Sequence, residues 1–131
     1  MGLTLAAELN GYPGPSHLLE LAAQLGLSDD QRSHIQGLFD AMKAETLPIG
    51  ERLISQERML DALFATHTAT PEAIAAATAT IGDTQAMLRA AHLKYHLSNC
   101  CSLRRSSVMP SCAAMLAANR SLINTVELGQ R

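Results

Sequence analysis

The sequence predicts an all-α fold, an elongated helical hairpin made of a short helix, a long bent helix and a returning helix. Hydrophobic residues make up 47% of the 131 residues and aromatic residues only 3%, and the apolar content is mostly the helix formers alanine and leucine. A helix-start sequence at residues 27–31 opens a long amphipathic pattern, and a second such pattern follows after a short connection. At this length the chain has room for one domain.

Turn-forming residues end the N-terminal segment, residues 1–15. The sequence GYPGP at residues 11–15 combines proline, which presets φ, with glycine, which permits positive φ. Ser16 is then expected to cap a short helix whose natural stop is Gly26. The apolar side of this helix is Leu18, Leu19, Leu21, Ala22 and Leu25.

The long helix is expected to begin with a capping box, in which Ser28 and Gln31 each bond the other's backbone N–H. Asp29 and Asp30 follow in the first turn, where the helix dipole favours negative charge. Because Pro48 lacks a backbone N–H, we expect a bend near residues 45–48, either within one curved helix or between two helices end to end. The apolar face, with spacings of three and four, is Ile35, Leu38, Phe39, Met42, Ile49, Leu53, Met59, Leu60, Leu63 and Phe64.

The returning helix is expected to begin at Thr70, Pro71 and Glu72, which fit the cap and the first two helical positions. Small residues at 73–80 permit close helix approach. The connection at residues 67–69 is short, so the two helices should run antiparallel. Since a thin hairpin has little core, we also expect a homodimer. The apolar face of this helix is Ile74, Ala77, Ile81, Met87, Leu88, Ala91 and Tyr95.

The amino-acid composition of the chain changes near His96. Residues 1–97 hold 6 Lys/Arg and 11 Asp/Glu, whereas residues 98–131 hold 4 Arg, 1 Glu and all three cysteines. The helical periodicity stops after Leu97. The sequence therefore predicts a helical domain at residues 16–97 and an aberrant, poorly ordered tail at residues 98–131.

Charge and hydropathy exclude two classes of partner. The acidic body lacks the basic footprint of a nucleic-acid-binding protein. No apolar run approaches the ~20 residues that span a bilayer. Residues 1–7 lack the basic and apolar parts of a signal peptide, which by itself predicts a cytosolic protein.

Residues 27–31 (LSDDQ) resemble the LTxxQ motif of the Spy/CpxP family, with Leu27, Ser28 and Gln31 at the motif positions. Residues 2–21, 39–60 and 90–97 are similar to a bacterial subgroup described as Spy/CpxP-like or heavy-metal-resistance proteins. The family groups periplasmic helical chaperones and stress proteins with the zinc-binding ZraP and the CnrX-type metal sensors. The resemblance implies a periplasmic location, antiparallel helix pairing in a cradle, and a fourth helix.

The chain departs from that subgroup at both ends. Members carry an export signal and further sequence before the segment that matches Met1, so the resemblance implies a truncation and a start at an internal Met. Members follow the segment AHLKYHL (residues 91–97 here) with LTPEQ and then LRGY. Codons can be chosen for Ser98–Met115 so that reading one base back gives QLLLLTPEQRDAELRGY. We therefore interpret residues 98–131 as a frameshifted tail, a hypothesis that the gene's nucleotide sequence tests.

Three histidines are candidate metal ligands. His92 and His96 lie four residues apart and share a helix face, a spacing that suits two ligands. The metal sensors that the chain resembles use histidines from an early and a late helix, so the resemblance implies that His17, with Glu20 or a water, converges with them on Zn, Ni or Co. The alternative is that His92 and His96 flank Tyr95 on a polar edge and bind nothing, so that no cofactor is required.

The remaining histidines and the cysteines give weaker signals. His34 and His67 are predicted to be surface residues. Cys100 and Cys101 are adjacent, so their side chains diverge and chelate one soft metal ion poorly. No functional role is expected for these two cysteines.

Methionine and leucine side chains on the hairpin form a candidate surface for unfolded clients or for a dimer. Methionine suits such a surface because it is flexible and polarisable. The alternative is an ordinary hairpin or dimer core. The candidate residues are Leu38, Met42, Leu53, Met59, Leu60 and Met87.

No catalytic constellation appears, because the sequence has no phosphate-cradling glycine loop, GxSxG or HExxH motif. We therefore expect a protein that is not an enzyme. The leading hypothesis is an ATP-independent periplasmic chaperone or envelope-stress protein of the Spy/CpxP type, which binds unfolded clients on a helical cradle. The alternatives are a periplasmic Zn, Ni or Co sensor or resistance protein, and a non-functional fragment of a frameshifted gene.

Overall fold

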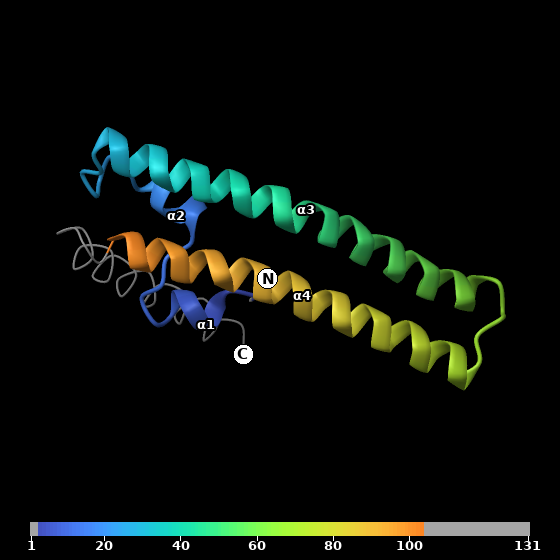
Figure 1. The fold of residues 1–131 in the computed structure, drawn as a ribbon. Helices are drawn as coiled ribbons and strands as arrows, with labels where there is room; N and C mark the ends of the chain where they lie inside the picture. The colour runs from blue at the N-terminus through green and yellow to red at the C-terminus, as the bar shows by residue number, and fades with distance from the viewer. Residues whose placement is uncertain (1–2, 104–131) are drawn as a thin grey trace, which may run out of the picture. The chain divides into compact units, whose positions relative to one another are not determined.

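The computed structural model describes residues 3–103, and within that range it is helical without strands. The helices are α1 (Leu5–Glu8), α2 (Pro15–Glu20), α3 (Asp29–Ala65) and α4 (Pro71–Leu103). The loop at residues 66–70 reverses the chain, so α3 and α4 run antiparallel on either side of it (Figure 1). The predicted all-α helical hairpin is confirmed, whereas the homodimer stays a prediction.

The chain divides into two compact units, each described here by itself. The first unit comprises residues 1–41 and 93–131, of which the structure describes 3–41 and 93–103. The second unit comprises residues 42–92 and contains the hairpin loop. None of the described helices is long and apolar enough to cross a membrane.

Both long helices begin as their sequences predict. At the start of α3, Ser28 N donates to Gln31 Oε1 (2.9 Å) and Gln31 N donates to Ser28 Oγ (3.2 Å), which is the reciprocal pair of a capping box. At the start of α4, Ala73 N donates to Thr70 Oγ1 (3.1 Å) and Pro71 is the first helical residue. Each cap satisfies N–H groups that have no partner within the helix.

The short helix differs from its prediction at both ends. It begins at Pro15 with Gly14 as the N-cap, so Ser16 is not the cap. Proline fits the first helical position because its missing N–H is not needed there and its φ is already helical. The helix ends at Glu20, and turns at residues 21–26 follow until Gly26, whose φ is +62°.

The two turns that precede α3 and α4 close with the same backbone hydrogen bonds. Leu27 N donates to Ala22 O (3.1 Å) and Gly26 N donates to Ala23 O (3.3 Å). At the end of α3, Thr68 N donates to Leu63 O (3.0 Å) and His67 N donates to Phe64 O (3.1 Å). This is the Schellman pattern, which requires a left-handed residue at its centre. His67 therefore takes a φ of +56°, a value that costs less for glycine.

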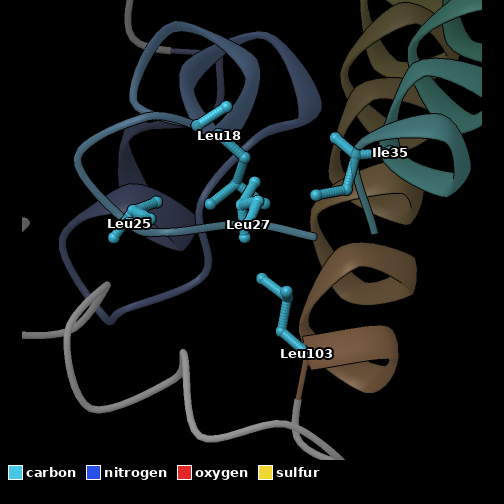
Figure 2. Packing of buried hydrophobic residues seen from close by; sticks show 6 residues of the cluster. Leu18, Leu25, Leu27, Ile35 and Leu103 are labelled. Atoms are coloured by element: carbon cyan, nitrogen blue, oxygen red, sulfur yellow. The ribbon is translucent and has the colours of Figure 1, made fainter. Parts of the chain in front are cut away.

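The core of the first unit gathers leucine and isoleucine side chains from α2, the turn after it, α3 and α4. Figure 2 shows Leu27 near the centre of this cluster, with Ile35 of α3 and Leu103 of α4 on one side. Burial of such side chains stabilises a fold by about 1.5–3 kcal/mol each. The cluster joins the start of α3 and the end of α4 to the N-terminal segment. Its buried members are Leu18, Ala22, Leu25, Leu27, Ile35 and Leu103.

Two sequence predictions about helix ends are corrected. α3 runs without a break from Asp29 to Ala65 with Pro48 inside it, so the alternative of two helices end to end is wrong. α4 continues through residues 98–103, which were assigned to the poorly ordered tail. Its last turns are held by burial, since Asn99 is 0% and Leu103 2% exposed. The rest of the predicted tail, residues 104–131, lies outside the described residues.

Candidate binding groove

An apolar groove of about 440 Å³ runs between α3 and α4 in the second unit. Long side chains line it from α3 and small ones from α4. It is open to solvent on one side, and Met59 at its edge is 67% exposed. We call this the α3–α4 groove, and its lining residues are Gln56, Met59, Leu63, Ala73, Ala76, Ala77 and Thr80.

The spacing of residues explains why a groove forms there. Gln56, Met59 and Leu63 follow one another by three and four residues, so they lie on one face of α3. The facing stretch of α4 offers only the β-carbons of Ala73, Ala76 and Ala77 and one threonine. Small side chains opposite long ones leave space, and that space is apolar.

The same seam continues along the second unit to a charged contact. Arg52 precedes Gln56 by four residues, and its Nη2 donates to the Sδ of Met87 (3.1 Å). Met87 is itself 50% exposed. A guanidinium group and a flexible thioether therefore lie together beyond the groove residues.

The predicted client-binding residues fall into two groups. Met59 and Met87 are exposed, and Met59 lines the groove. The other four (Leu38, Met42, Leu53 and Leu60) are half-buried along α3. Sequence reasoning missed Gln56 and Thr80, and it interpreted the small residues at 73–80 only as permitting close helix approach.

Each of the two late histidines donates one ring N–H to a backbone carbonyl. The Nδ1–H of His92 donates to Leu88 O of its own helix (2.9 Å). The Nδ1–H of His96 donates to Tyr12 O (2.7 Å), and this side chain is 4% exposed. A methyl group added to Gly14 would lie 3.0 Å from both Cε1 and Nε2 of His96. The His96 ring is thus packed against the N-terminal segment.

Within residues 3–103, no group of three or more His, Cys, Asp or Glu side chains lies close enough to hold a metal ion. The convergence of His17, Glu20, His92 and His96 on one metal ion stays a prediction.

A buried amide, missed from the sequence, completes the attachment of His96 to the N-terminal segment. Asn99 donates from Nδ2 to Pro13 O (3.3 Å), while its Oδ1 is buried without a partner. His96 and Asn99 thus bind the carbonyl groups of Tyr12 and Pro13, an arrangement we call the His96–Asn99 clamp. No local pattern indicates it, because each bond joins residues more than eighty positions apart.

A second cavity, of about 500 Å³, lies in the first unit beside His34 and Ser102. The Ser102 hydroxyl donates to Ser98 O (3.0 Å) and so accepts from His34 Nε2–H (2.8 Å). A serine nucleophile needs the opposite arrangement, with the histidine as acceptor. Ser102 also lies in the last turn of α4, where backbone carbonyls disfavour a developing negative charge. The geometry gives no argument for acyl transfer.

The resemblance to the Spy/CpxP family is carried only by the residues quoted for it above. No family model matches the chain, and no curated protein or solved structure gives a significant match.

Proposed function

We propose that the protein is an ATP-independent chaperone that binds apolar segments of unfolded polypeptides on the second unit. The observation that carries this proposal is the α3–α4 groove, an open apolar surface edged by the exposed Met59. A bound segment would bury its side chains against Met59, Leu63 and the alanines of α4. The binding free energy would come from apolar burial, which needs no nucleotide and no chemical step.

The exposure pattern of the second unit supports the proposal. Among residues 42–92 the buried side chains are few and small or medium in size: Thr46, Ile81, Thr84 and Ala91. Large apolar side chains are instead left exposed: Leu47, Ile54, Met59, Phe64 and Met87. Contiguous exposed apolar surface is typical of a site that binds another molecule, and Met59 joins this exposed set to the groove. Methionine adapts to partners of different shape.

The residues that resemble the Spy/CpxP family suggest the same activity, because the helical chaperones of that family act in the periplasm without ATP. We therefore propose a periplasmic location. The metal-sensor hypothesis is not favoured by any contact of His17, Glu20, His92 or His96.

The proposal is tested by diluting a chemically denatured reporter protein into buffer and following its aggregation by light scattering. We expect the chain to suppress scattering both in EDTA and in buffer with added zinc. Ala76→Glu places a carboxylate in the groove and should reduce the affinity for the client at least about tenfold, since apolar contact would desolvate an unpaired charge.

The matched control is Ala75→Glu. Ala75 is also exposed on α4, next in sequence to Ala76, but it does not line the groove. Both substitutions add the same charge near Glu72, so only their position relative to the groove differs. Equal loss in the two variants, or no suppression by the wild type, would contradict the proposal. Suppression that requires zinc would favour a metal-dependent function instead.

A further inference from the structure

Gln56 gives the α3–α4 groove a hydrogen-bond acceptor that the chain itself does not use. Its Oε1 is buried and has no hydrogen-bond partner. A buried acceptor without a partner costs about 1–3 kcal/mol. The side chain lines the groove and is only half-buried, so bringing this oxygen to a ligand would require rotation about its terminal torsions and no movement of the backbone.

The other polar side chain in the groove already uses its only donor. The Thr80 hydroxyl donates to Ala76 O (3.0 Å) within its own helix. The remaining lining side chains, Met59, Leu63 and the three alanines, offer no strong donor or acceptor. A ligand that fills the groove therefore meets an apolar surface, beside one amide oxygen that becomes accessible when the Gln56 side chain rotates.

We propose that the groove selects extended polypeptide segments, placing an apolar side chain among Met59, Leu63 and Ala76 and donating a neighbouring backbone N–H to Gln56 Oε1. This inference rests on the proposed chaperone function and names the conformation that the site recognises. An extended segment has free N–H groups to offer. Residues inside a helix have none, because each N–H is bonded to the carbonyl four residues earlier.

The size of the groove favours the same occupant. A helix with its side chains is about 10–12 Å across, whereas about 440 Å³ is the volume of a small-ligand pocket. One or two side chains of an extended chain fit such a space. Alternate side chains of an extended segment point to opposite sides, so one enters the groove while its neighbours stay in solvent.

The inference is tested with a fluorescently labelled, unstructured peptide of alternating leucine and serine, whose binding is followed by anisotropy. A series of variants of this peptide is also made. Each variant carries one N-methyl group at a different backbone amide, so each lacks one N–H donor. We expect one position in the set to weaken binding to the wild type about 2–12-fold, the range of one net hydrogen bond. Gln56→Met keeps the length of the side chain without its acceptor, and its binding should not respond to methylation.

Further arms separate the possible results. Gln56→Glu retains an acceptor and should restore the sensitivity to methylation. Unmodified peptide that binds wild type and Gln56→Met equally, with no sensitive position, would overturn the hydrogen bond while leaving apolar binding intact. Tighter binding of a helix-stapled peptide would overturn the preference for extended chains. No binding of any peptide, together with no difference between Ala76→Glu and Ala75→Glu in the aggregation assay, would instead remove the proposed function itself.

Discussion

At the residue scale, two positions show how single backbone sites hold the fold. Gly14 faces the ring of His96 so closely that a β-carbon would lie 3.0 Å from two ring atoms. His67 adopts a left-handed conformation that its side chain disfavours. A side chain at the first position would press on the His96 ring, and the second position carries a side chain at a cost in backbone strain.

Gly14→Ala is expected to destabilise the chain by about 1–3 kcal/mol, because the His96 ring is fixed by its bond to Tyr12 O and must shift to admit a methyl group. The free energy of unfolding in urea measures this loss. Gly37→Ala is the control, since Gly37 lies in α3 with nothing within 4 Å of an added β-carbon. That control should stabilise the helix by about 0.5–1 kcal/mol. Destabilisation by both substitutions would contradict the role given to the His96 contact.

His67→Gly should raise the free energy of unfolding by about 1 kcal/mol, because glycine adopts a φ of +56° without the strain of a β-carbon. The side chain is exposed, so little packing is lost. His67→Ala keeps the β-carbon and should give no such gain. If alanine stabilises the chain as much as glycine, the imidazole rather than the backbone is the source of the strain.

At the element scale, the starts of the long helices could be predicted from the sequence, whereas the last turns of α4 could not. The starts of α3 and α4 were predicted correctly, because their signals are local: Ser28 with Gln31, and Thr70 before Pro71. The continuation of α4 past Leu97 was not predicted. Its residues are mostly serine, asparagine and cysteine, which are weak helix formers.

Tertiary contacts override that weak propensity. Asn99 bonds Pro13 O, and Leu103 packs into the cluster around Leu27. Pro13 and Leu27 are both distant in sequence from the end of α4, so no local periodicity predicts these contacts.

The α3–α4 groove also depends on contacts between residues that are distant in sequence. Met59 was predicted from its residue type, but the contribution of Gln56 depends on which helix faces it.

Leu103→Ala tests whether the end of α4 belongs to the core. We expect a loss of about 2–5 kcal/mol in the free energy of unfolding, since the side chain is 2% exposed and its removal leaves a cavity. Leu97→Ala is the control on the same helix, because Leu97 is 57% exposed. A frameshifted tail that made no contribution to the fold would show equal, small effects at both positions.

At the scale of the whole molecule, the two units differ in how their apolar side chains are used. The first unit buries a leucine and isoleucine cluster and bonds its N-terminal segment through His96 and Asn99. The second unit buries few side chains and exposes many large ones. Under the chaperone function that we propose, stability and client binding would belong to different parts of one chain. The part that binds would then be the one that opens most readily, since regions with few buried contacts do so.

Amide hydrogen exchange under native conditions tests this division within residues 3–103. We expect backbone amides of α3 and α4 in the second unit to exchange at least about tenfold faster than those near Ile35 and Asn99, because fewer buried contacts must break to open them. Leu103→Ala should accelerate exchange in the first unit. A saturating extended peptide should slow exchange around residues 56–80, where the groove residues lie. Equal protection of the amides from exchange in both units would instead show that the chain opens as one cooperative unit. The second unit would then not be held open for clients, which would contradict the division proposed here.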